Sequence, residues 1–479
     1  MNASALELAG MLAGCGAAAT AIVIPDPRLR RAAVVVALLV APTLVAGDVW
    51  NEDRVVSFRD DPGVVAAAGL AVALAVAALA IAFRRWPTAF PILAIALLPL
   101  RVPVEIGGET ANLLIPLYVV IAAGAVTWVL TPSARRAAEE QGSVTWLRWA
   151  LAATLVLYAV QSSYSEDVSN AIENAGFFLI PFAILFTLLV EVQWTRRLLA
   201  QVLVAVAGMG ALFAAIAIYQ YVARDLFFND DLFDSNQLHI YFRVNSLFYD
   251  PNVLGRYLAL AIVALAAYLA WGTDRRLLGL ATLAAGVSLC GLAFSFSISS
   301  FAAVLAGLGT LALLRWWWRG ALIAGAMGAV ALVVLLALGG APKSEFPGRD
   351  IEGGHVPLFE GGVDLFEDRP FAGWGSGSFG AAFYEQVERT AKTNVSSHAE
   401  PVSVASEQGV VGLVVYVALV VLALVVMLGA NPGRSFERSA VAACFVTMLV
   451  HSLGYAAFAI DPATWTLLAL GVVLRARAT

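Results

Sequence analysis

Long apolar stretches recur along the whole chain, and no other feature limits its fold as strongly. A helix that crosses a bilayer needs about 20 mostly apolar residues, and fewer where neighbouring helices shield its ends. The sequence predicts an all-α polytopic membrane protein with about 14–15 transmembrane helices. The expected spans are 4–24, 32–47, 64–83, 87–100, 111–130, 147–164, 172–191, 198–222, 253–271, 277–295, 298–314, 320–339, 407–430, 438–457 and 462–474.

Composition supports the bilayer as the solvent for most of this chain. Of its 479 residues, 61% are hydrophobic and 13% are charged, whereas a soluble globular domain is about half apolar and about a quarter charged. The net charge of -5 is mild and the basic residues are scattered, so no nucleic-acid partner is expected. Cys15, Cys290 and Cys444 lie far apart in apolar stretches, which indicates packed core residues and no disulfide or metal framework.

Basic residues predict how the chain is oriented in the membrane. They follow every second span, and short basic connections face the cytoplasm. The first apolar stretch has no basic segment before it, which favours a retained span over a cleaved signal peptide. We therefore expect the N-terminus outside and the C-terminus in the cytoplasm. The basic residues are Arg28, Arg30, Arg31, Arg84, Arg85, Arg135, Arg136, Arg196, Arg197, Arg275, Arg276, Arg315, Arg319, Arg434, Arg438, Arg475 and Arg477.

Two connections are much longer than the rest, and both fall on the external side. They are residues 223–252 and 340–406, and they divide the chain into helical groups at 1–222, 253–339 and 407–479. Long loops in a compact protein usually carry function. The chemistry is therefore expected in these two loops and at the span ends beside them.

Three arginines on the external side are unusual, because the bias in membrane proteins is against external cations. They are Arg101, Arg243 and Arg256. A structural explanation is that each pairs with a carboxylate or reaches lipid headgroups, the candidate carboxylates being Glu105, Asp250 and Glu400. The functional explanation is phosphate binding, because a guanidinium forms two parallel hydrogen bonds with a phosphate and stays charged.

His398 is the best candidate for a proton acceptor. It lies at the end of the second long loop within Ser396-Ser397-His398-Ala399-Glu400-Pro401, beside the next span. An imidazole can take up a proton near neutral pH. His451 lies inside an apolar span, where a packed, hydrogen-bonded role is the default. His239 and His355 lack neighbouring signals.

Two groups of residues resemble the O-antigen ligase and O-antigen polymerase superfamily of bacterial membrane proteins. In that family one external loop carries an arginine and then an aromatic residue, Pro-Asn and a glycine. A second carries Pro and Gly-x-Gly, and then a histidine followed by Gly-x-x-Gly. The matching residues here are Arg243, Phe248, Pro251, Asn252 and Gly255, and then Pro370, Gly373, Gly375, Gly377, His398, Gly409 and Gly412. The resemblance is best over residues 285–430.

The sequence departs from the family pattern at two places. Ala399 stands after the histidine, where the family usually has Asn, Ser or Gln. The stretch Ser295–Phe301 lacks the arginine of a Ser-Arg pair that is common there. If that arginine normally binds phosphate, then Arg243, Arg256 or Arg101 must bind more of it in this chain.

The resemblance implies transfer of a glycan from a polyprenyl-diphosphate-linked saccharide to an acceptor hydroxyl, at the outer face of the bacterial inner membrane. His398 would be the general base, and Arg243, Arg256 and Arg101 would bind the diphosphate. Glu400 would orient His398 or bind acceptor hydroxyls. One base with in-line attack predicts inversion, without metal or cofactor. The acidic residues Asp230, Asp231 and Asp234 lack the spacing of a calcium loop.

Other readings stay open at this point. The acceptor could be a lipid, a growing saccharide or a protein, and polysaccharide assembly proteins are possible partners. A transporter or flippase of the same lipid-linked saccharide would place ionisable residues near the membrane midplane. The spans carry few such residues, mainly Glu7 and His451, which favours chemistry at one surface. Ala399 and the missing arginine also leave room for an inactive scaffold.

Overall fold

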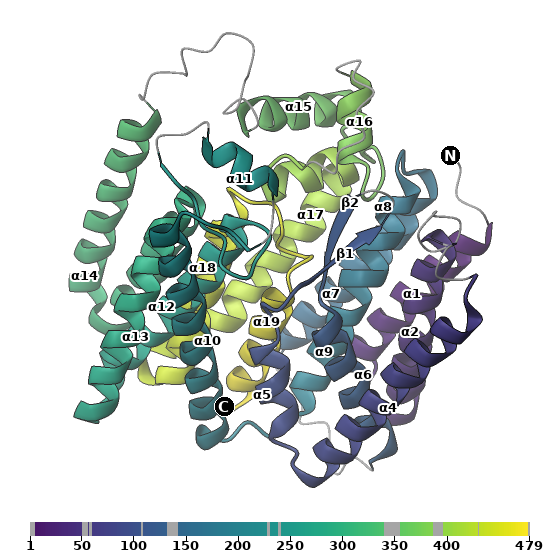
Figure 1. Cartoon of the computed structure of the whole chain (residues 1–479), viewed down its shortest axis with the longest axis horizontal. Helices are drawn as coiled ribbons and strands as arrows, with labels where there is room; N and C mark the ends of the chain where they lie inside the picture. The colour runs from purple at the N-terminus through teal and green to yellow at the C-terminus, as the bar shows by residue number, and fades with distance from the viewer. Residues whose placement is uncertain are drawn as a thin grey trace.

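The protein is a bundle of long apolar helices (Figure 1). The computed structural model describes residues 5–49, 56, 60–106, 109–131, 142–227, 230–237, 241–339, 355–386, 396–429 and 431–477. Within these residues, ten helices are long and apolar enough to cross a membrane. The prediction of a polytopic membrane protein built from helices is confirmed.

The bundle helices are α1 (Ala5–Val23), α2 (Pro27–Asp48), α4 (Pro62–Arg85), α5 (Ala89–Ala96), α6 (Ile115–Leu130), α7 (Gly142–Gln161), α8 (Val168–Glu173), α9 (Ile180–Glu191), α10 (Arg196–Ala223), α12 (Pro251–Trp271), α13 (Arg275–Ser295), α14 (Ile298–Gly339), α17 (Glu400–Leu428), α18 (Phe436–Ser452) and α19 (Pro462–Ala476). A π-helical turn, Asn174–Leu179, joins α8 to α9. Three shorter helices, α11 (Asp230–Gln237), α15 (His355–Asp368) and α16 (Phe379–Gln386), lie at one end of the bundle, at the top of Figure 1. We call this the loop end. We call the opposite end, where Arg84, Arg85, Arg275 and Arg276 lie, the basic end.

Several helices begin at an Asp-Pro pair, and the sequence explains why they begin there. Asp26, Asp61, Asp250 and Asp461 each accept a hydrogen bond from a backbone N–H of the first helical turn. The following proline occupies the first helical position, where a missing N–H costs nothing. Three of these helices, α4, α12 and α19, have their starts at the end opposite the basic residues Arg84, Arg275 and Arg475.

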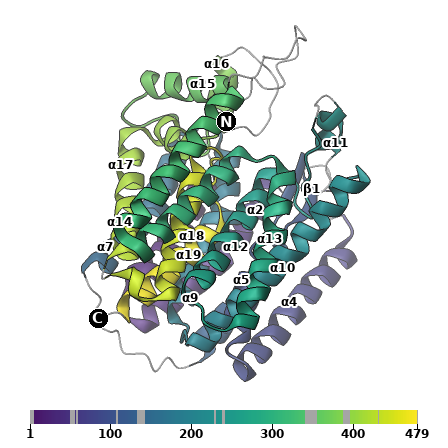
Figure 2. The same ribbon diagram turned by 90° about the vertical axis from the view of Figure 1, so that its left-hand side faces the viewer.

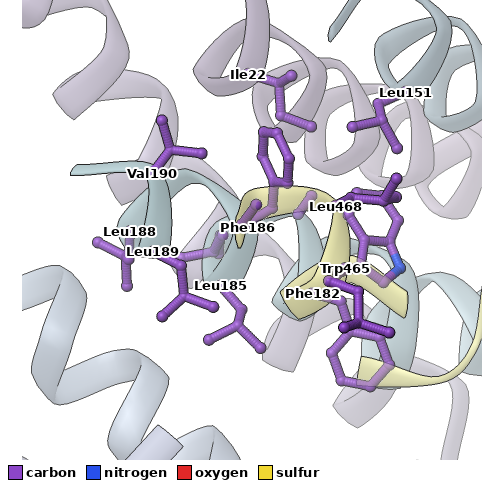
Figure 3. Close-up of a cluster of buried hydrophobic side chains, with 14 of the residues drawn as sticks. Ile22, Leu151, Phe182, Leu185, Phe186, Leu188, Leu189, Val190, Trp465 and Leu468 are labelled. Carbon is purple, nitrogen blue, oxygen red and sulfur yellow. The ribbon is translucent and has the colours of Figure 1, made fainter. Parts of the chain in front are cut away.

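The centre of the bundle is α9, which is apolar on every side. Ten of its twelve residues are buried, as expected of a helix surrounded by other helices. Phe182 and Phe186 lie beside Trp465 and Leu468 of α19 (Figure 3). By contrast, only 6% of the apolar window of α4 is buried within the protein, so most of α4 is left to face lipid.

The predicted span at 87–100 is wrong. Helix α5 has eight residues, about 12 Å of helix, which cannot cross a hydrocarbon core of about 30 Å. Pro99 disfavours helical geometry at Leu98, and the chain continues as a hairpin of β1 (Val102–Ile106) and β2 (Glu109–Leu113). These strands are antiparallel, with Val102 opposite Leu113. Arg101 therefore stands between a short helix and a hairpin.

The two spans predicted at 298–314 and 320–339 are the two arms of α14. The backbone at Trp317 leaves helical geometry, with φ 47° and ψ -114°. The arms fold back on each other, since a Cβ atom added at Gly309 would lie 3.3 Å from Cβ of Ala324. Figure 2 shows α14 in front of α18 and α19. Arg315 and Arg319 flank this reversal, as the basic-connection pattern predicted.

Candidate functional site

Two of the three predicted arginines lie together at the loop end. Nη2 of Arg256 is 2.7 Å from Oδ2 of Asp461, and both side chains are buried. Arg101 is close enough that the charges of Asp461 and Arg256 both act on it. Among the described residues, Nε of Arg101 and Nη1 of Arg256 are buried polar atoms without a hydrogen-bond partner. A buried donor without a partner costs free energy. The cluster can therefore donate further hydrogen bonds to an anion.

The charged groups of this cluster also shift the pKa values of Arg101 and Tyr455. Burial lowers the pKa of the Arg101 guanidinium, the charge of Asp461 raises it, and the charge of Arg256 lowers it again. The Arg256 guanidinium lies over the ring of Tyr455, with Cζ 5.5 Å from the ring centroid. Burial and then the Asp250 carboxylate raise the pKa of the Tyr455 hydroxyl, which therefore stays protonated. Asp461 forms the salt bridge with Arg256 and its charge also acts on Arg101, while the charge of Arg256 in turn acts on the buried Glu400 carboxylate.

An apolar cavity of about 160 Å³ opens beside these arginines. Arg101, Arg256 and Asp461 line it near the loop end, and Phe436 and Glu437 line it near the basic end, where α18 begins. Apart from these charged groups its walls are mostly apolar side chains from α5, α10, α12, α18 and α19. The cavity therefore suits an amphiphile, with an anionic head beside the arginines and a hydrocarbon chain along the helices.

Arg243 is the third predicted arginine, and it is held on both its backbone and its side chain. Asn236 in α11 accepts a hydrogen bond from its N–H and donates one to its carbonyl oxygen, both at 2.9 Å. Nε of Arg243 donates to the carbonyl oxygen of Ser295 at 3.1 Å, and Nη2 donates to Oδ1 of Asn252 at 3.4 Å. The guanidinium is thus fixed between the start of α12 and the end of α13.

His398 occupies a strained position just before α17. Its φ angle is +59°, a left-handed conformation that is uncommon for a residue with a side chain. Strained residues gather at functional sites, where the surrounding structure holds them. Its neighbour Ser397 is buried and shares a hydrogen bond of 2.8 Å with Ser403. The side chain of His398 is half-buried at the loop end.

Glu400 ties this end of α17 to the arginine cluster. Its carboxylate accepts hydrogen bonds from the backbone N–H groups of Phe458 and Ala459, at 2.9 and 3.4 Å. Asp461, the partner of Arg256, follows two residues after Ala459. Both carboxylate oxygens are thus engaged by the segment that carries Asp461. The predicted roles of Glu400, orienting His398 or binding acceptor hydroxyls, stay predictions.

The glycine motifs of the second loop hold α17 in place. Gly409 has a φ of +64° and breaks α17. The carbonyl oxygens of Ser406 and Glu407, freed by the break, accept from the N–H groups of Trp374 and Gly375, and Val410 donates to Pro370. The Glu407 carboxylate accepts from the N–H groups of Gly377 and Phe379. The loop therefore replaces the hydrogen bonds that α17 loses.

The two departures from the family pattern have structural counterparts. Ala399 is the residue that caps the start of α17, and it supplies no side-chain hydrogen bond there. The stretch without the arginine is the turn from α13 to α14, and the Ser295 carbonyl oxygen in this turn accepts from Arg243. Arg243 thus reaches the turn where the family usually has its own arginine.

Sequence reasoning missed Asp461, the partner of Arg256; the carboxylates it considered were Glu105, Asp250 and Glu400. The side chain of Glu105 lies outside the described residues. The Asp461-Pro462 pair did signal a helix start, but a partner 205 positions away from Arg256 has no local signature. No group of three metal-ligating side chains occurs among the described residues, and the side chains of Asp230 and Asp231 lie outside them.

Comparison with known proteins finds a family for part of the chain, and Arg101, Arg243 and Arg256 lie outside that part. Residues 283–417 match the O-antigen ligase family. This stretch holds the turn between α13 and α14, the glycine-rich loop, His398 and the break in α17. No curated protein matches the chain. The chain is therefore a polytopic membrane protein in which residues 283–417 are similar to the O-antigen ligase family.

Proposed function

We propose that this protein transfers a glycan from a polyprenyl-diphosphate donor to an acceptor hydroxyl, as an O-antigen ligase or polymerase does. The family match implies ligase- or polymerase-like glycan transfer. One observation carries the choice of donor: the buried guanidinium groups of Arg101 and Arg256, with N–H groups to spare, stand at the end of a long apolar cavity. Few ligands other than an anionic lipid have both parts.

The proposed chemistry uses the chain's own residues. The diphosphate is the leaving group, and Arg101, Arg243 and Arg256 neutralise the charge that grows on it as the glycosidic bond breaks. His398 takes the proton from the acceptor hydroxyl as its oxygen attacks the anomeric carbon. One attack from the face opposite the diphosphate inverts that carbon. The scheme needs neither a nucleotide nor a metal.

We also propose that the loop end faces away from the cytoplasm, in a bacterial inner membrane. Basic residues border the other end of the bundle: Arg84 and Arg85 end α4, Arg196 and Arg197 begin α10, Arg275 and Arg276 begin α13, and Arg475 ends α19. Short basic connections stay in the cytoplasm. The connection with Arg135 and Arg136 lies outside the described residues. Donor and acceptor would then meet at the outer leaflet.

Transfer in proteoliposomes tests this function. The protein is reconstituted with a polyprenyl-diphosphate glycan and a lipid or saccharide acceptor, and movement of the glycan from carrier to acceptor is followed. We expect transfer by the wild type, loss in His398→Ala, and at least a hundredfold loss in Arg243→Ala, in line with removal of about 2.7 kcal/mol or more of transition-state stabilisation. His355→Ala and Arg224→Ala are matched controls that should retain activity.

Two outcomes would contradict the proposal. If the glycan changes leaflet but stays on its carrier, the protein is a flippase. If the wild type neither transfers nor moves the glycan with any acceptor, it is a scaffold. Normal transfer by His398→Ala would remove only the general-base assignment.

A further inference from the structure

A row of buried polar side chains runs from His451 in α18 to Arg243. Nε2 of His451 lies 3.1 Å from Oγ of Ser300, and Oγ of Ser300 lies 2.8 Å from Oγ of Ser297. Ser297 donates to Oδ1 of Asn252 at 2.8 Å, and Arg243 donates to the same oxygen. The exposed fractions of His451, Ser300 and Ser297 are 0%, 0% and 1%. Water therefore does not compete for the bonds among His451, Ser300 and Ser297.

Counting hydrogens fixes the direction of every bond in this row. A guanidinium only donates, so Asn252 must present its carbonyl oxygen to Arg243. Ser297 gives its single hydroxyl hydrogen to that oxygen, and it must therefore accept from Ser300. The hydrogen of Ser300 is then used, so Nε2 of His451 must donate to Ser300. The row is a relay of donors that begins at His451 and ends at the oxygen that binds Arg243.

The packing around the relay leaves it little freedom. Gly255 in α12 faces the turn between α13 and α14, and a Cβ atom added there would lie 2.4 Å from Oγ of Ser300. Ser299 is a second neighbour of the His451 ring at 3.4 Å. The other side-chain bond of Arg243 ends on Ser295, in the same turn. A shift of this turn would therefore move both anchors of the guanidinium.

We propose that His451 is a positioning residue for Arg243. Its imidazole holds the turn and the Asn252 amide so that the Arg243 guanidinium stays oriented toward the donor diphosphate. This inference rests on the proposed function, because it takes the phosphate role of Arg243 from there. The inference assigns a structural role to a histidine that lies inside a span.

Kinetics in proteoliposomes test the inference, with the polyprenyl-diphosphate glycan as the varied substrate. His451→Phe keeps the ring but loses the donor, and it should raise the donor KM roughly tenfold, within the range for coupled residues of one network. Ser300→Ala should act in the same direction. His451→Gln supplies an amide N–H and should restore most of the loss. Thr447→Val, also buried on α18 but bonded to Ala443 of its own helix, should leave KM unchanged.

A double-mutant cycle separates positioning from general damage. In an Arg243→Ala background, His451→Phe should change the donor KM no further, because the group it orients is gone. Effects that multiply in the double variant would overturn the proposal, as would a His451→Gln variant no better than His451→Phe. If Arg243→Ala alone leaves both kcat and the donor KM unchanged, the phosphate role of Arg243 fails, and the inference fails with it for that separate reason.

Discussion

At the residue scale, the ion pair between Arg256 and Asp461 places a negative carboxylate beside the proposed binding site of a diphosphate, which is also negative. The pair is almost fully buried, with exposed side-chain fractions of 4% and 9%. Asp461 can hold one guanidinium, whereas Arg101 and Arg256 together offer N–H groups that it does not use. A diphosphate carries more charge than one carboxylate and could satisfy both arginines. We propose that Asp461 is the partner that holds the buried Arg256 guanidinium in place.

Asp461→Asn tests this balance. Asparagine still caps α19, but Arg256 loses its counter-charge, and breaking a buried pair costs about 3–5 kcal/mol. We expect a clearly lower melting temperature in detergent, and a larger rise on adding inorganic pyrophosphate than the wild type shows. Glu166→Gln removes the partner of Arg369 in an exposed pair and should change stability by less than about 1 kcal/mol. Equal melting temperatures for the two variants would contradict this role of Asp461.

At the element scale, the break in α17 sets the direction of its first segment, which begins two residues after His398. The segment from Glu400 to Gln408 leaves the line of the following helix at Gly409, and the loop from Pro370 to Gly377 fills the gap. Gln161 of α7 adds a hydrogen bond to the Gln408 carbonyl oxygen at 3.1 Å. The angle of the break, and with it the direction of this first segment, depends on a close backbone approach.

Gly409→Ala should therefore be severely destabilising. A Cβ atom there would lie 2.3 Å from the carbonyl oxygen of Phe371, and the φ of +64° disfavours any side chain. We expect a loss of stability of more than about 2 kcal/mol, measured by thermal unfolding in detergent. Gly208→Ala in α10 meets no atom within 4 Å and should be neutral or stabilising by up to about 1 kcal/mol. A Gly409→Ala variant as stable as Gly208→Ala would show that the break is not required.

The helices also show how much of the fold and of the candidate site could be predicted from the sequence. Apolar length identified most helices, because that signal is local. Helix α17 begins at Glu400, seven positions before the predicted span at 407, because its first two turns are partly polar yet buried against other elements. The motif residues near Arg243, Asn252 and His398 were found by their order along the chain. Asp461, Asn236 and the Ser297–His451 relay were not, because they become neighbours only after folding.

At the scale of the whole molecule, the two termini lie toward opposite ends of the bundle. Figure 1 marks the N-terminus near the loop end and the C-terminus near the basic end. The basic connections gather at one end, and the arginine cluster, His398 and the glycine-rich loop gather at the other. A transporter would need its charged groups to continue through the bundle, whereas the buried cluster of Arg101, Arg256 and Asp461 is at the loop end.

Accessibility of single cysteines tests this orientation. Cys15, Cys290 and Cys444 are first replaced by alanine, which leaves no thiol in the chain. Phe371, 78% exposed at the loop end, and Trp318, 60% exposed at the basic end, are then each changed to cysteine in separate variants. In sealed right-side-out vesicles, a membrane-impermeant maleimide should label Phe371→Cys at once and Trp318→Cys only after permeabilisation. The reverse pattern would place the site in the cytoplasm, where a donor in the outer leaflet could not reach it. Labelling of both in sealed vesicles would contradict the path of α14 across the membrane, because its reversal at Trp317 lies at the end opposite the loops.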